Sequence, residues 1–290
     1  MGSGRGHQVA ESFDTIDHAH LRDFLKRRVR DGVLIRLIGK WLNAGVLEDG
    51  CITHPDTGSP QGGVVSPLRS NLFLHYVLDD GFQQEVQPRL KGESFLIRYA
   101  DDLVMGFSQE EDARRVLAVL PKRFAKYGLT IHPDKTRLVP FERPSHDPKR
   151  STTEERELPG TFDLLGFTHF WSRSLRGAWV VKRTTSRSRL SRGLKALSDW
   201  CRKNRHLPAA EPHRTLSQKL VGHFAYYGNT GNSVALSLFR RVTVQIWRQW
   251  LSRRRRAGRI PWDEFKRFLE RYPLPPPIAI HSVCRRVART

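Results

Sequence analysis

The residues best placed for chemistry are two adjacent carboxylates in the segment IRYADDLVMGF, residues 97 to 107. Asp101 and Asp102 stand between apolar and aromatic runs typical of short strands, which predicts a β-hairpin with the acids at its tip. Side chains alternate faces along a strand, so we expect Tyr99 and Asp101 on one side and Arg98 and Asp102 on the other, at least until the turn bends the chain.

Two neighbouring aspartates in a hairpin most often form a solvated turn. The apolar flanks of this pair favour a different interpretation, because carboxylates packed against apolar walls are costly unless a cation neutralises them. Hard oxygen ligands suit Mg²⁺, and two Mg²⁺ ions about 3.5–4 Å apart are the usual arrangement for displacement at phosphorus. The acid pair therefore predicts Mg²⁺-dependent chemistry on a phosphate.

Composition indicates the kind of partner. The chain has 290 residues, with 50 Lys and Arg against 29 Asp and Glu, and a formal net charge of +21. This excess favours nucleic acid over an anionic membrane surface. We expect a cytoplasmic protein without membrane contact, since no apolar run approaches about 18 residues and the first residues lack a signal core. The three cysteines show neither a disulfide framework nor zinc-ligand spacing.

One change of composition predicts two domains, 1–179 and 180–290. Strand-like and helix-like segments alternate in the first, with a helix or helix pair expected over residues 21–38, helices over 67–78 and 110–126, and strands around 129–141 and 164–171. In the second, acids become scarce and arginine dominates. We expect an α+β fold followed by a helical region.

Several strings resemble the group II intron reverse transcriptase family, in the same order and at similar separations. They are SPQGGVVSPLRSNLFLHYVLD, YADD, GLTIHPDKT and LLGF in the first domain, and GHFAYYGNTGN and RYPLPPPIAIH in the second. The resemblance implies a reverse-transcriptase palm, an antiparallel sheet with packed helices, followed by an α-helical thumb or maturase domain. It covers almost all of the chain.

The resemblance also implies roles for single residues. Asp101 and Asp102 would ligate Mg²⁺, and Lys135 would lie near the triphosphate. Gln61 and Gly62 would contact the incoming nucleotide, since glycine permits close backbone approach and Gln61 offers an amide. The alternatives are a plain helix-entry turn for the PQGG loop and ordinary surface charge for Lys135. The LLGF motif would lie near the primer end, or could equally be core and turn.

The string FDTIDH resembles the first palm motif of the family. In that register Phe13 is the aromatic residue that excludes a ribose 2′-hydroxyl, although it could also be a core residue. The same register puts Gln8 where the family has its principal metal-binding aspartate. A neutral glutamine cannot supply the charge that a carboxylate gives a bridging metal site.

Nothing in the sequence before this motif matches the fingers that hold template in the family. MGSG could be a cloning scar, a reassigned start or the result of a truncation. We therefore expect either a truncated, degenerate protein or one whose missing parts come from a separate chain or an upstream segment.

Basic side chains in the second domain are expected to contact RNA. Leu190, Leu194, Leu197 and Trp200 form an apolar helical stripe, so the other side of that helix would present basic residues. Tryptophans beside a second basic cluster suit stacking on RNA as well as charge. A solvated charged face is the ordinary alternative. The expected RNA-binding residues are Arg187, Arg189, Arg192, Lys195, Arg202, Lys203, Arg254 and Arg255.

Two functions remain open. One is RNA-directed DNA synthesis with Mg²⁺, and the other is RNA binding by a maturase-like relative that has lost synthesis. A nucleotide cyclase also carries carboxylates on a palm hairpin, but the net charge and the arginine-rich region argue against it. No endonuclease module with Cys or His metal-ligand spacing follows the thumb, so we expect no DNA cleavage.

Overall fold

The computed structural model describes residues 5–9, 11–12, 18–43, 46–48, 51–53, 66–131, 136–144, 160–174, 176–255 and 258–281. The chain divides into two compact units, Met1–Leu164 and Leu165–Thr290. The boundary falls earlier than the change of composition near residue 179, because the strands from 167 to 185 belong to the second unit.

An antiparallel sheet forms the centre of the first unit. Its strand order is β5 (Ser94–Tyr99), β6 (Asp102–Phe107), β1 (Arg5–Val9) and β8 (Arg137–Val139). Two smaller antiparallel pairs join β2 (Glu11–Ser12) to β7 (Thr130–Ile131) and β3 (Val46–Glu48) to β4 (Cys51–Thr53). The short strand β9 (Phe162–Leu164) ends the unit.

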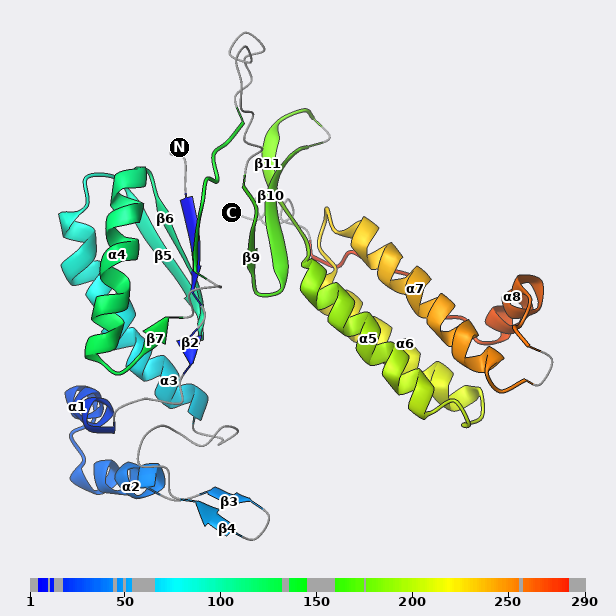
Figure 1. The fold of residues 1–290 in the computed structure, drawn as a ribbon, viewed down its shortest axis with the longest axis horizontal. Helices are drawn as coiled ribbons and strands as arrows, with labels where there is room; N and C mark the ends of the chain where they lie inside the picture. The colour runs from blue at the N-terminus through cyan, green and yellow to red at the C-terminus, as the bar shows by residue number, and fades with distance from the viewer. Residues whose placement is uncertain are drawn as a thin grey trace. The chain divides into compact units, whose positions relative to one another are not determined.

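Helix α4 (Glu110–Lys126) and the helical segment that begins with α3 (Ser66–Leu74) pack on one face of this sheet (Figure 1). Helices α1 (His18–Arg28) and α2 (Gly32–Asn43) lie beyond the end of the sheet. After α3 the chain continues through two π-helical segments, η1 (His75–Asp80) and η2 (Phe82–Val86), and a 3₁₀ turn, η3 (Gln87–Arg89). Leu103, Met105 and Phe107 of β6 join Phe73 and Phe124 in the core, so alternate β6 residues face these helices.

The second unit begins with an antiparallel hairpin, β10 (Phe167–Arg173) and β11 (Trp179–Thr185). Among its described residues, four helices follow: α5 (Arg187–Lys203), α6 (Ala210–Tyr227), α7 (Ser233–Ser252) and α8 (Trp262–Arg271). Their core includes Leu197 and Trp247. The extended segment after α8 returns to the end of α6, where Asn229 and His281 form an isolated bridge.

These elements confirm the predicted fold class, an antiparallel sheet with packed helices followed by a mainly helical region. The expected helix over 67–78 exists, but its last turns are π-helical. In the part of the chain that the structure describes, no helix is both long and apolar enough to cross a membrane.

Candidate active site

The β5–β6 hairpin carries the acid pair at its tip. Tyr99 pairs with Asp102, so Ala100 and Asp101 form a two-residue turn. Ala100 has φ of 54°, a left-handed conformation that glycine adopts more readily at the first central position of a tight hairpin turn. A strained backbone at a turn persists only where its surroundings hold it, and such positions gather at functional sites.

The tip opens to solvent on the side of Tyr99. The Tyr99 side chain is 68% exposed, Asp101 is exposed and Asp102 is half-buried. Directly opposed residues of an antiparallel pair project to the same face. Tyr99 therefore shares its face with Asp102, and the expected alternation through the acid pair is wrong, because the turn at Ala100 interrupts the strand.

Arg98 ties this turn to the helices below it. Its Nε and Nη2 donate to the two carboxylate oxygens of Asp79, at 2.8 and 2.7 Å. Its Nη1 donates to Asn71 Oδ1 at 2.9 Å and to the carbonyl of Ala100 at 3.0 Å. A planar guanidinium can make all four contacts at once. One side chain thus connects the strained turn to both α3 and η1.

The partner of Arg98 belongs to a wider charged network. Asp79 Oδ2 lies 3.5 Å from His75 Nδ1, and His75 Nε2 lies 3.0 Å from a guanidinium nitrogen of Arg28. The Nε of Arg28 donates to the hydroxyl of Tyr76. These contacts link α1 to η1 and stiffen the support under the hairpin.

Strand β1 lies directly beside β6. The backbone of Gln8 pairs with Val104, two residues from Asp102, and on its other side with Arg137. The strand that carries Gln8 is therefore the neighbour of the acid hairpin. Four other expected site residues, Phe13, Gln61, Gly62 and Lys135, lie outside the described residues.

Two carboxylates are a suitable but incomplete set for Mg²⁺. Within the described ranges no group of three or more His, Cys, Asp or Glu side chains is close enough to hold a metal ion. Mg²⁺ is commonly bound by one or two protein carboxylates together with substrate phosphates and water. Asp101 and Asp102 at an exposed tip fit this mode of binding.

The LLGF motif forms a second turn, held by two tyrosines of the second unit. Leu165 and Gly166 have φ of 52° and 78°. The hydroxyl of Tyr226 donates to the Leu165 carbonyl at 3.0 Å. A Cβ on Gly166 would lie 2.8 Å from the hydroxyl of Tyr227, so a larger residue would displace that tyrosine. This packing joins LLGF to the AYYGNTGN motif.

Asn232, the last residue of that motif, is fully buried and uses all its hydrogen-bonding groups. Its Oδ1 accepts from the Thr185 backbone and the Thr184 hydroxyl, both at 2.9 Å. Its Nδ2 donates to the Thr185 hydroxyl at 2.9 Å and to the Tyr227 carbonyl at 2.8 Å. It therefore connects the end of β11 to α6 and the start of α7.

The basic residues expected to contact RNA fall into two groups. Arg189, Arg192, Lys195, Arg202 and Lys203 are exposed on α5 and share roughly 140° of its circumference at about 100° per residue. Arg187 is also exposed, at the first position of α5.

The second basic group, after α7, is already engaged. Arg254 donates to the Leu207 carbonyl at 2.9 Å. Arg255 pairs with both carboxylate oxygens of Glu264, at 2.7 and 2.8 Å. These two arginines contribute to the packing of the second unit as well as to its surface charge.

Sequence reasoning missed Arg98, Asp79 and Asn71 as residues that position the site. The available signal was an arginine inside an otherwise apolar strand. A charged side chain there needs a buried partner. The sequence offers many acids, so only the fold identifies Asp79 as that partner.

Comparisons with known proteins agree with this architecture. Residues 9–169 match the family model described as reverse transcriptase (RNA-dependent DNA polymerase). The group II intron-encoded protein LtrA of Lactococcus lactis subsp. cremoris is 37% identical over 82 residues, which are 28% of this chain and 13% of that protein. The putative COX1/OXI3 intron 1 protein of Saccharomyces cerevisiae is 24% identical over 274 residues, 75% of this chain and 31% of that protein.

Solved structures give a weaker likeness. Telomerase from Candida albicans, in complex with a fragment of telomeric RNA, is 14% identical with a TM-score of 0.44, covering 93% of this chain and 46% of that chain. The chain thus spans less than half the length of these relatives. Its family model nevertheless covers more than half of the chain and includes the acid hairpin. The chain therefore belongs to the reverse transcriptase family, and the predicted relationship to group II intron reverse transcriptases and maturases is confirmed.

Proposed function

We propose that this protein is an RNA-directed DNA polymerase of the group II intron type, which extends a DNA primer on an RNA template. The observation that carries the proposal is the hairpin tip, where Arg98 holds the turn that carries Asp101 and Asp102, beside strand β1. Two carboxylates on a supported turn at a solvent-accessible position suit a site that must receive a large substrate.

Each residue has a distinct part in this proposal. Asp101 and Asp102 would hold Mg²⁺ together with the triphosphate, and the ion would neutralise charge on the transferring phosphate. Arg98 donates to the Ala100 carbonyl and would support the backbone of the turn that carries both carboxylates. By family resemblance, Lys135, Gln61 and Gly62 would contact the nucleotide, and Phe13 would exclude ribonucleotides.

RNA is the proposed partner. The net charge of +21 and the exposed basic side of α5 support it. We also propose a cytoplasmic location, because the three cysteines do not have the spacing of a disulfide framework and because the proposed partner is RNA.

A second candidate function is RNA binding without synthesis, as in a maturase-like relative. Gln8 favours it, because its backbone lies on the strand next to the acid hairpin and a glutamine brings no negative charge to that position. In this form the protein would bind intron RNA, and synthesis would need a separate chain or an upstream segment that supplies the fingers and the missing aspartate.

Primer extension on an RNA template with deoxynucleotides and Mg²⁺ separates the two functions. Extension that is lost in Asp101→Asn and Asp102→Asn, and that rises in Gln8→Asp, would support the polymerase. Parallel reactions with ribonucleotides test the role of Phe13. No extension by any of these proteins, together with tight and salt-sensitive RNA binding, would support the second function. Equal extension by Asp101→Asn and the unmodified chain would contradict the proposed site.

A further inference from the structure

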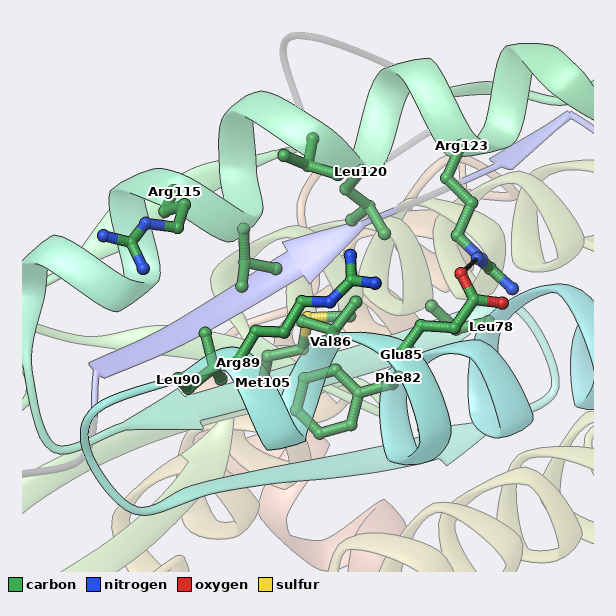
Figure 2. A pocket seen from close by; sticks show the side chains of 12 residues that line it. Leu78, Phe82, Glu85, Val86, Arg89, Leu90, Met105, Arg115, Leu120 and Arg123 are labelled. Carbon is green, nitrogen blue, oxygen red and sulfur yellow. Dashed lines mark hydrogen bonds and ion pairs between the residues drawn. The ribbon is translucent and has the colours of Figure 1, made fainter.

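A cavity of about 190 Å³ lies on the helix-covered side of the first unit, between the π-helical segments and α4 (Figure 2). Met105 of β6 contributes to its lining. Its remaining apolar lining consists of Leu78, Phe82, Val86, Leu90, Val116, Val119 and Leu120. An engineered apolar cavity of roughly 150 Å³ binds benzene, so this space can hold an aromatic ring or the end of an aliphatic chain.

One side of the cavity is formed by two π-helical segments, η1 and η2. These segments lie on both sides of Gly81. Such turns are rare in proteins, and those that occur often lie at functional sites. Arg123 packs against Gly81, where a Cβ would clash with its guanidinium. Its Nε donates to the Val77 carbonyl at 2.6 Å, so the arginine supports the π-helical turn.

Charged side chains lie among the lining residues. Arg123 is neutralised by Glu85, whose carboxylate accepts from it at 2.6 Å. Arg89 and Arg115 also line the cavity, and neither has a hydrogen-bond or ion-pair partner among the residues that the structure describes. Figure 2 shows Arg89 extending from η3 and Arg115 from α4. The cavity thus combines an apolar interior with two solvent-exposed arginines among its lining residues.

We propose that this cavity binds a small amphiphilic anion, a carboxylate or phosphate that carries an aliphatic chain or an aromatic ring. The apolar part would fill the space above Met105, where burial removes it from water. The anionic head would pair with Arg89 and Arg115, whose planar guanidinium groups suit carboxylate and phosphate oxygens. An amphiphile of the opposite charge would leave both arginines unpaired, and an uncharged one would gain only the apolar part of the binding energy.

The site is independent of the proposed polymerase activity. Of the residues that line it, only Met105 belongs to the hairpin, and it lies on the strand face that packs against the helices. Binding is therefore measured directly, without a catalytic assay.

Decanoate is a suitable probe, with decanol as the uncharged counterpart. Calorimetric titration of the full chain should give saturable binding of decanoate and at least about tenfold weaker binding of decanol. The double variant Arg89→Ala/Arg115→Ala should bind decanoate about tenfold more weakly or worse, and its affinity for decanol should be unchanged. Val119→Trp should block both probes, because Val119 lines the cavity and is 48% exposed, so a larger ring can enter without disrupting the core.

Lys122→Ala/Lys126→Ala is the matched control. It removes the same charge from exposed positions of α4 that do not line the cavity. Thermal unfolding of every variant checks that the fold is kept. Equal decanoate binding by the arginine variant and the control, or equal binding of decanoate and decanol, would overturn the proposal.

A vesicle assay distinguishes two sources of the anion. Phosphatidylcholine vesicles with and without phosphatidylglycerol are compared for the arginine variant and the lysine control. A deficit in phosphatidylglycerol binding that is specific to the arginine variant indicates a lipid ligand. Equal vesicle binding by the two variants, with the decanoate difference retained, indicates a soluble ligand of the same chemistry.

Discussion

The guanidinium of Arg98 forms a two-point ion pair with the carboxylate of Asp79, at 2.8 and 2.7 Å, and the Arg98 side chain is only 13% exposed. The same guanidinium donates to the Ala100 carbonyl, at the turn that carries the acid pair. The ion pair thus supports the geometry of the candidate active site as well as the stability of the first unit.

Replacing Arg98 should therefore affect both stability and synthesis. Arg98→Met leaves the half-buried Asp79 and the Ala100 carbonyl without their donor, which should cost about 2–4 kcal/mol in urea unfolding. Arg98→Lys keeps the charge but loses the planar guanidinium that donates to several acceptors at once, so we expect a smaller loss of stability and a clear fall in primer extension. Arg114→Lys, in an exposed pair with Glu110, is the control and should change stability by less than about 0.5 kcal/mol. Unchanged primer extension by Arg98→Lys would show that the guanidinium contacts of Arg98 do not position the site.

Ala100 should tolerate glycine but not a β-branched residue. Its φ of 54° penalises any side chain, and a β-branched one most. Ala100→Val should destabilise the protein by about 1–2 kcal/mol, whereas Ala100→Gly should be close to neutral because relief of strain offsets added chain entropy. Chemical denaturation measures both, with Ala118→Val on the exposed side of α4 as the control. If Ala100→Val proved no worse than the control, the turn would not have this conformation.

The exposed side of α5 should set the salt dependence of RNA binding. Arg192→Ala/Lys195→Ala/Lys203→Ala removes three of its charges. For single-stranded RNA, each lost phosphate contact should reduce the slope of log K against log salt by about 0.7. Lys219→Ala/Arg241→Ala/Arg267→Ala removes three exposed charges from other helices and is the matched control. Filter binding at several salt concentrations gives the slopes, and equal slopes for the two variants would exclude α5 as the RNA-binding side.

Asn232 should be among the most sensitive positions of the second unit. Asn232→Ala removes the acceptor of the Thr185 backbone N–H and one of the donors to the Tyr227 carbonyl, in a fully buried position. We expect a loss of about 3 kcal/mol or more in the free energy of unfolding. Gln218→Ala, at an exposed position of α6, should change it by less than about 0.5 kcal/mol. Similar losses in the two variants would contradict the role assigned to Asn232.

His223 should make the protein sensitive to mild acid. Burial lowers the pKa of His223 from 6.5 to about 4, and its ring stacks on Phe239 at 3.7 Å beside Tyr227. Between these pH values the unfolded chain binds a proton that the folded chain does not. Its contribution to stability is therefore fully present above pH 6.5 and is lost as the pH falls towards 4.

The melting temperature, followed from pH 7 to pH 4, measures this effect. His223→Phe should flatten the acid side of the profile, because phenylalanine keeps the stacking and cannot titrate. His206→Phe, at an exposed position, should leave the profile unchanged. A profile for His223→Phe that matches the unmodified protein would assign the acid sensitivity to other groups.

The sequence by itself determined the fold class, the family and the place of the acid pair. These depend on short-range patterns: alternating apolar residues around Asp101 and Asp102, helical spacing in α4 and α5, and motifs whose order is visible along the chain. Alternation and helical spacing follow from backbone geometry and need no knowledge of distant contacts, whereas the family was recognised by the resemblance of its motifs.

Only the tertiary structure decided how the acid hairpin is supported and where the cavity lies. Tyr99 and Asp102 share a face because the chain turns at Ala100, which strand alternation alone does not reveal. Arg98 meets Asp79 and Asn71, and Asn232 meets Thr185, across long separations in sequence. The cavity with Arg89 and Arg115 depends on π-helical turns packed against α4. Such contacts are chosen by the packing of whole elements, since many residues of the right chemistry compete for each partner in the unfolded chain.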